Sequence, residues 1–185
     1  MVIGIRKYFV TLTTILLALL LAISILPASA NASSGRTLYV DEVTQQMMLD
    51  MQVGDSFVTT SQITTSDGTV LEITQIVTQR GEGVKDLQTT VKNSTVFGFT
   101  MTTTWGYRDG NILFQSDRIS DIYSAIGWKD MGVSSEVHTV FTYLNPQEYY
   151  SYHKRDFKCL FVHEYPYILH LCYGDGTSSF QTGIY

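Results

Sequence analysis

The chain contains 185 residues, with 12 basic and 17 acidic side chains and a formal net charge of −5. An acidic protein gains no electrostatic help in binding phosphate backbones or anionic lipids, which disfavours nucleic acid and acidic membranes as partners. The length suits one domain with an adequate hydrophobic core.

Residues 1–32 have the three parts of a secretory signal peptide in the usual order. Two basic residues come first, residues 10–26 carry no charge, and small residues follow Pro27. We therefore expect residues 1–32 to be a signal peptide that is cleaved after Ala30 or Ala32. Cleavage removes two basic residues and leaves 10 against 17 acidic ones, for a net charge of about −7.

The same apolar run approaches the length of a membrane-spanning helix, so an uncleaved leader that tethers the domain to the membrane is the alternative. No cysteine that a lipoprotein would need precedes Cys159, and no apolar tail precedes Tyr185. We therefore expect a secreted, extracellular protein that is soluble and has no stable membrane insertion after leader cleavage.

Residues 33–55 are interpreted as a lead-in to the main domain, with a strand and a short helix. Between Asp41 and Met51 the apolar residues recur near helical spacing. Asp41 can cap the first turn of this helix and Gly54 can end it. The methionines predict an apolar stripe packed on a sheet, with an adaptable binding surface as the alternative.

Residues 56–185 are expected to form the β domain. They are rich in Thr, Val, Ile, Tyr and Phe, and turn pairs such as Asp67-Gly68 separate the runs. This composition predicts strands and tight turns. We expect strands at 56–65, 69–79, 97–107, 119–125, 133–144, 157–163 and 168–173.

From residue 97 to residue 107, aromatic residues and Met alternate with threonine and glycine. Because alternate side chains of a strand point to opposite faces, we expect one face to be buried and the other to be wet. The pair Asp109-Gly110 favours a two-residue type I′ turn. That turn would place Trp105 opposite Phe114, so that both strands bury the same face.

The only two cysteines flank an expected turn at residues 164–167. A four-residue loop there would place Cys159 directly opposite Cys172. Directly opposed residues of an antiparallel pair lie close enough for a bridge, and export permits a disulfide. We therefore predict a Cys159–Cys172 disulfide, worth about 3 kcal/mol in the chain-entropy model, with two buried free thiols as the alternative.

Strands at this spacing, with turn signals roughly every 8–12 residues, predict an all-β fold with two packed antiparallel sheets. We expect an immunoglobulin-like sandwich with one short N-terminal helix, and a flattened β-barrel is the runner-up. The absence of alternation between strands and helices argues against a parallel α/β architecture.

Histidines and acidic residues offer few signs of an active site. Glu136 and His138 share a strand face and form an acid–base pair in principle, although such a face is more often simply solvated. His163 and His170 fall near the cysteines, but their spacing matches no zinc motif. No serine-hydrolase elbow, phosphate-binding loop or metalloprotease motif occurs. We assign no catalytic residue, no cofactor and no metal ligand.

Tyrosines concentrate around the last connections of the chain. Tyr149, Tyr150 and Tyr152 lie within four residues, and three rings so close in sequence cannot all face one core. We therefore predict that at least one of them belongs to a surface that binds an extracellular protein or a glycan.

Residues 100–110, the Gly127-Trp128 pair and residues 172–176 resemble small exported β domains of Gram-positive bacteria. In those domains a threonine-rich strand leads into an aromatic-x-Tyr and a turn, and a Gly-Trp pair and a terminal strand that ends near Asp-Gly follow. The resemblance implies a bacterial exported protein with a β fold. It carries over no functional residue.

Together these features predict a secreted, non-enzymatic binding or interaction domain whose ligand is unknown. Two alternatives stay open. One is a secreted hydrolase with a carboxylate- or histidine-based site, and the other is an exported toxin or bacteriocin-like factor.

Overall fold

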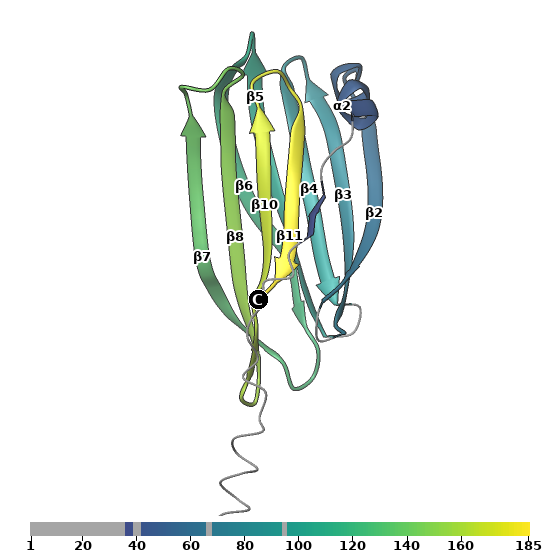
Figure 1. Ribbon diagram of the computed structural model, residues 1–185, viewed down its shortest axis with the longest axis vertical. Helices are drawn as coiled ribbons and strands as arrows, with labels where there is room; N and C mark the ends of the chain where they lie inside the picture. The colour runs from purple at the N-terminus through teal and green to yellow at the C-terminus, as the bar shows by residue number, and fades with distance from the viewer. Residues whose placement is uncertain (1–35, 39–41, 66–67, 94–95) are drawn as a thin grey trace, which may run out of the picture. The chain divides into compact units, whose positions relative to one another are not determined.

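The computed structural model describes residues 36–38, 42–65, 68–93 and 96–185 (Figure 1). Within these ranges, eleven strands form two antiparallel sheets, and one short helix accompanies them. The predicted leader and its cleavage sites lie outside the described residues.

The first sheet, called sheet B, contains five strands, each antiparallel to the next. These strands are β2 (Ser56–Thr64), β3 (Val70–Gly81), β4 (Val84–Asn93), β5 (Phe97–Arg108) and β6 (Asn111–Ser124). They follow one another in chain order, so sheet B is a meander with β2 and β6 at its edges.

The second sheet, called sheet A, joins the rest of the chain to one strand of the lead-in. Its strands are β1 (Arg36–Leu38), β7 (Lys129–Phe141), β8 (Glu148–Cys159), β9 (Val162–Glu164), β10 (Pro166–Tyr173) and β11 (Ser178–Ile184). The order is β1-β11-β10-β8-β7, and β9 pairs with the end of β8. Helix α2 (Glu42–Leu49) follows β1.

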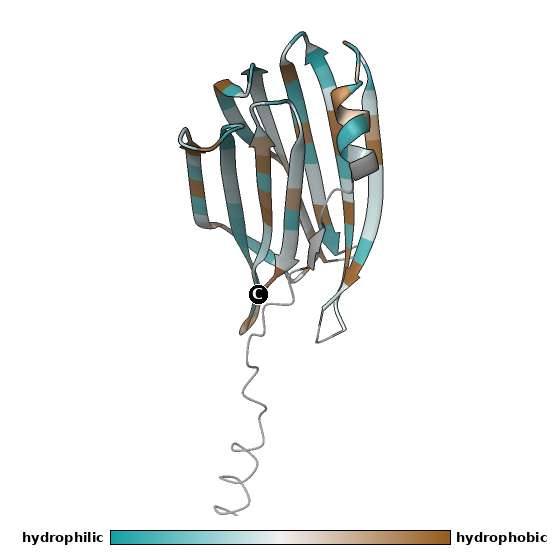
Figure 2. Ribbon diagram, turned by 45° about the horizontal axis from the view of Figure 1, so that its top comes forward, coloured by the Kyte–Doolittle hydropathy of each residue, from teal (hydrophilic) through white to brown (hydrophobic). Residues whose placement is uncertain are grey.

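The two sheets pack against each other through one apolar face each. Burial alternates along β3 and β8, so every second side chain of these strands points inward. In Figure 2 β8 is nevertheless mostly teal, because its inward side chains include Ser151 and His153. The main core cluster contains Ile63, Leu71, Ile73, Val91, Phe97, Phe99, Met101, Phe157, Ile168, Phe180 and Ile184. These residues come from both sheets, which confirms the predicted two-sheet sandwich. The barrel does not form, because β6 and β7 are edge strands of different sheets.

Strands β5 and β6 form the predicted hairpin around Asp109-Gly110. Both turn residues have positive φ, 51° and 80°, as a type I′ turn requires. The predicted register is wrong beyond a bulge at Leu113, because Phe114 lies opposite Gly106 instead of Trp105. The Phe114 ring occupies the space above Gly106, where an added Cβ would come within 2.2 Å of the ring.

The short helix forms within the predicted lead-in, and a buried lysine holds it to the sandwich. Met48 is fully buried, whereas Met47 is half exposed. Lys85 of β4 donates from Nζ to the carbonyl oxygens of Met48 and Gly176. Burial lowers the pKa of Lys85 to about 8. The expected helix cap, Asp41, lies outside the described residues.

The predicted disulfide is wrong. Cys159 lies opposite Val162, where β9 pairs with the last residues of β8. Cys172 lies opposite Tyr149, near the first residues of β8. The two cysteines therefore occupy opposite ends of this strand pairing, and both thiols are free.

A misplaced turn explains this error. The chain does not reverse at residues 164–167 but directly after Cys159, through Leu160 and Phe161. Strands β9 and β10 then run along β8 in one continuous register. Pro166 is the first residue of β10, a position at which a strand tolerates a residue without a backbone N–H.

Candidate functional site

Charged side chains gather where the edge strand β6 of sheet B approaches the edge strand β7 of sheet A. His138 Nδ1 lies 2.9 Å from Asp117 Oδ2, and His138 Nε2 lies 2.8 Å from Glu136 Oε1. The hydroxyl of Tyr149 donates to the same Asp117 oxygen. The acid–base pair considered from the sequence is therefore in contact, and Asp117 extends it into a bridge between the two sheets.

The geometry of this bridge suits an ion pair better than a catalytic base. Both ring nitrogens of His138 face carboxylate oxygens, and an imidazole ring donates from both nitrogens only when it is protonated. A general base needs a free lone pair that can accept a substrate proton. Ser151 lies 3.1 Å from His138 Nδ1 but is fully buried, so its hydroxyl does not face solvent. The hydrogen bond from His138 holds the pKa of Glu136 below its ordinary value.

A chain of hydrogen bonds continues from Asp117 into the core. Thr103 donates its hydroxyl to Asp117 Oδ1 over 2.5 Å, and the same oxygen of Thr103 lies 2.8 Å from His170 Nδ1. Because the single proton of Thr103 goes to the carboxylate, His170 must donate from Nδ1. His170 Nε2 then accepts from the hydroxyl of Thr89, at 2.8 Å. Burial lowers the pKa of His170 to about 3, which agrees with a neutral ring.

His153 lies beside this network without joining it by a hydrogen bond. Its side chain is buried, its Nδ1 lies 3.5 Å from Glu136 Oε1, and its ring packs 5.6 Å from the Phe99 ring. Burial lowers the pKa of His153. His163, which the sequence placed near the cysteines, pairs with Asp156 instead. No group of three or more His, Cys, Asp or Glu side chains could hold a metal ion in the described ranges.

The outer face of sheet A carries a different kind of surface, which we call the aromatic face. Its exposed or partly exposed members are Tyr150, Tyr152, Tyr173 and Tyr185, with Leu169 and Leu171 between them, and the Tyr167 ring packs among them at only 2 % exposure. The residues of β8 and β10 meet by strand pairing, since Leu171 lies opposite Tyr150 and Leu169 opposite Tyr152. The rings also touch one another: the centre of the Tyr167 ring lies 5.7 Å from that of Tyr152 and 5.1 Å from that of Tyr185.

The aromatic face carries several hydroxyl groups, with Glu148, opposite Tyr173, at one end and Lys154 at the other. Lys154 Nζ lies 5.2 Å from the centre of the Tyr185 ring, at the border of the face. The amide of Gln181 donates to the hydroxyl of Tyr167 over 3.2 Å. Burial raises the pKa of Tyr150 and of Tyr152, so both hydroxyls are neutral donors at ordinary pH. The surface therefore combines flat apolar rings with neutral hydrogen-bonding groups at their edges.

The structure separates the three tyrosines that the sequence grouped together. Tyr149 points inward and is 2 % exposed, and burial raises its pKa. Tyr150 and Tyr152 point to the outer face and are partly exposed. The other three tyrosines of the aromatic face were not predicted as site residues. Two of them, Tyr167 and Tyr173, lie on β10. They would have been predicted if the turn after β8 had been placed correctly, because β10 then lies directly beside β8.

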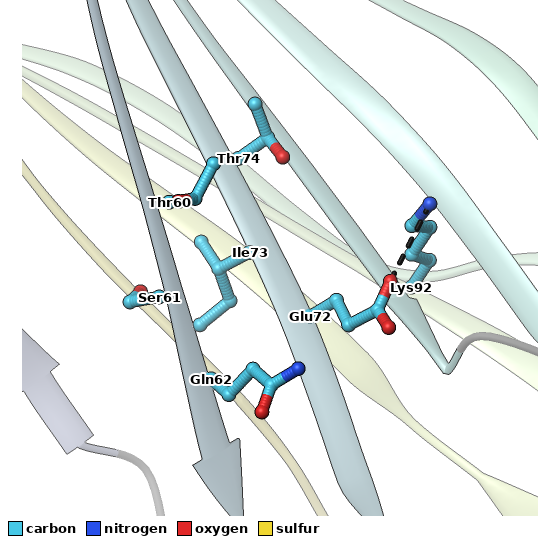
Figure 3. A pocket seen from close by; sticks show the side chains of 7 residues that line it. All are labelled: Thr60, Ser61, Gln62, Glu72, Ile73, Thr74 and Lys92. Atoms are coloured by element: carbon cyan, nitrogen blue, oxygen red, sulfur yellow. Dashed lines mark ion pairs between the residues drawn. The ribbon is translucent and has the colours of Figure 1, made fainter.

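A shallow depression of about 400 Å³ lies on sheet B, over β2, β3 and β4 (Figure 3). Its lining residues are Thr60, Ser61, Gln62, Glu72, Ile73, Thr74 and Lys92. The two charged side chains pair with each other, with Glu72 Oε2 3.4 Å from Lys92 Nζ. Its two charged side chains are paired with each other, and we assign no site to this depression.

The one helix of the described ranges, α2, has eight residues. None of the helical structure described here is long and apolar enough to cross a membrane. No protein-family model matches the chain, and no curated protein or solved structure matches it either.

Proposed function

We propose that this protein is an exported binding domain that recognises carbohydrate through the aromatic face of sheet A. The observation that carries this proposal is the group of partly exposed tyrosine rings on the outer surface of sheet A, where Tyr152 and Tyr185 pack against the buried ring of Tyr167. A sugar ring has a flat face of C–H groups and an edge of hydroxyls. Tyrosine offers the matching combination of an apolar ring and a polar tip.

The charge and rigidity of the aromatic face support a neutral, ring-shaped ligand. Lys154 and Glu148 lie at the two ends of the face, so a ligand over the central rings meets apolar and hydroxyl groups and not charge. The rings of Tyr152 and Tyr167 hold each other in place, which lowers the entropy cost of ordering them on binding. Export, which residues 1–32 predict, would bring this surface to extracellular glycans.

A glycan array probed with the protein tests this proposal. We expect binding to one class of glycan, weakened about 10- to 30-fold by Tyr152→Ala because a central aromatic contact is lost. The matched control is Tyr143→Ala, since Tyr143 is 79 % exposed in the β7–β8 connection and lies outside the aromatic face. A thermal melt of each variant checks that the fold is intact.

Three results would contradict carbohydrate binding by this face. The first is that no glycan is retained, and the second is that Tyr143→Ala weakens binding as much as Tyr152→Ala. The third is hydrolysis of a glycan that is lost in Glu136→Gln but unchanged in Tyr152→Ala. That last outcome would identify the hydrolase alternative and would place its chemistry at the His138 bridge.

A further inference from the structure

Two turns of the sandwich carry large apolar side chains that no described residue covers. Leu160 and Phe161 form the turn between β8 and β9 and are 81 % and 97 % exposed. Val162 follows them and is more than half exposed, and Ile126 is fully exposed in the β6–β7 connection. In Figure 2 the end of the β8–β9 hairpin is brown, the colour of hydrophobic residues. We call Ile126, Leu160, Phe161 and Val162 the apolar tip.

The two turns lie next to each other in space. An added Cβ at Gly127, in the β6–β7 connection, would lie 4.0 Å from the Sγ atom of Cys159, the last residue of β8. Figure 1 shows both turns at the same end of the sandwich. The two turns therefore expose their apolar side chains at the same end of the sandwich.

The backbone conformation of the β8–β9 turn does not favour the residues that occupy it. Leu160 has a φ of 52°, a conformation in which glycine, asparagine or aspartate is ordinarily found. The β5–β6 hairpin meets a similar demand with Asp109 and Gly110. Leu160 carries backbone strain, and Leu160 and Phe161 both expose apolar surface. A partner for these side chains would explain both features.

Two lysines lie beside the apolar tip. Lys129 and Lys158 lie directly opposite each other on β7 and β8, an arrangement in which like charges repel. Among the described residues, neither lysine has an ion-pair partner. Of the acids nearby, Asp130 pairs with Arg155, and Asp156 contacts His163 Nδ1 at 2.8 Å.

We propose that the apolar tip inserts into the interface of a lipid bilayer, where Lys129 and Lys158 contact lipid phosphate groups. Exposed Leu, Ile, Phe and Val side chains at a projecting tip gain free energy when they enter the acyl boundary of a membrane. Two unpaired lysines beside them gain the anionic partners that the protein does not supply. The acidic net charge argued against such a surface, but that value averages over the whole chain, whereas the charge beside the tip is positive.

Vesicles of phosphatidylcholine with about one-third phosphatidylglycerol test this proposal, prepared with ordinary or brominated acyl chains. Trp128 lies next to the β6–β7 turn and reports insertion by its fluorescence, while the fully buried Trp105 is out of reach of the bromine. We expect quenching of Trp128 by the brominated lipid. Because the readout is local to the tip, an apolar leader retained on the chain would not imitate it.

Variants separate insertion of the tip from general adhesion. Phe161→Ser should lower vesicle partitioning roughly 10-fold or more, because an aromatic side chain no longer leaves water. Tyr143→Ser, which removes a similarly exposed ring in the β7–β8 connection, should leave partitioning unchanged. Replacing Lys129 and Lys158 together by Gln should weaken binding several-fold and reduce its dependence on anionic lipid.

The proposal is overturned if brominated lipid quenches no fluorescence at any vesicle concentration. It is also overturned if Tyr143→Ser and Phe161→Ser weaken partitioning equally. A third contrary result is self-association in solution that Phe161→Ser abolishes, since the apolar tip would then be an interface between copies of this chain.

Discussion

Acidification should destabilise this protein, in large part through the fully buried His170. His170 is fully buried, and its pKa is lowered to about 3 from an ordinary value of 6.5. Between these two pH values the unfolded chain binds a proton at this histidine, and the folded protein does not. The free energy of unfolding must therefore fall as the pH falls from 6.5 towards 3.

The size of the effect follows from the two pKa values. Each unit of difference corresponds to about 1.4 kcal/mol. Between pH 7 and pH 4.5 this difference removes about 2.5 kcal/mol of stability, a large part of the roughly 5–15 kcal/mol that holds a domain together. The variant His170→Gln keeps a hydrogen-bonding side chain between Thr89 and Thr103 but cannot titrate.

Urea unfolding at pH 7 and pH 4.5, followed by tryptophan fluorescence, measures the effect. Other groups titrate equally in both proteins, so the quantity to compare is the loss of stability between the two pH values. We expect this loss to be about 2.5 kcal/mol smaller in His170→Gln than in the natural chain. Equal losses in the natural chain and His170→Gln would refute the argument that His170 is held neutral.

Three further predictions concern other buried groups. The free energy of unfolding should rise by about 2 kcal/mol between pH 7.5 and pH 9.5. In this range the folded protein releases the proton of Lys85, whose pKa is about 8, while the unfolded chain keeps it. Lys85→Met should abolish the rise in urea titrations. Ellman's reagent should modify Cys159 in the folded protein but not Cys172, which is buried and whose pKa burial raises. Treatment with a reductant should leave the mass of the protein unchanged, and a gain of two protons would contradict free thiols. Gly174→Ala should lower the free energy of unfolding by about 3 kcal/mol or more, because its Cβ would lie 2.2 Å from a backbone oxygen. Gly132→Ala has open space around it and should lower it by only about 1–2 kcal/mol, for its positive φ. Equal losses in the two variants would show that the close approach at Gly174 is unimportant.

Local features of the sequence predicted much of the fold. The alternation from residue 97 to residue 107 and the Asp109-Gly110 turn identified a hairpin that the structure contains, because both signals act over a few residues. Strand β4 was missed because its charged residues Lys85 and Asp86 are buried, and they break the expected alternation of apolar and polar side chains. Their burial depends on partners far away in the chain.

The candidate site was predicted only in part, because it too depends on residues far apart in the chain. Tyr150 and Tyr152 were selected from their neighbours in sequence, but the aromatic face also needs residues from β10 and the C-terminus. Those residues join it through strand pairing, and the turn at Leu160 and Phe161 decides that pairing. A turn made of two large apolar residues carries none of the usual turn signals, so the sequence pattern favoured the Pro-containing segment instead.

The order of strands along the chain also determines when each layer can form during synthesis. Sheet B is complete once residue 124 has been made, whereas sheet A needs β11 near the C-terminus, which pairs with β1 near the N-terminus. In the interval, the inner side chains of sheet B, such as Leu71 and Phe99, have no opposing layer. A nascent chain of this kind is prone to aggregate until its last strand appears. We therefore expect truncations that end before β11 to be recovered as insoluble material and not as smaller folded domains.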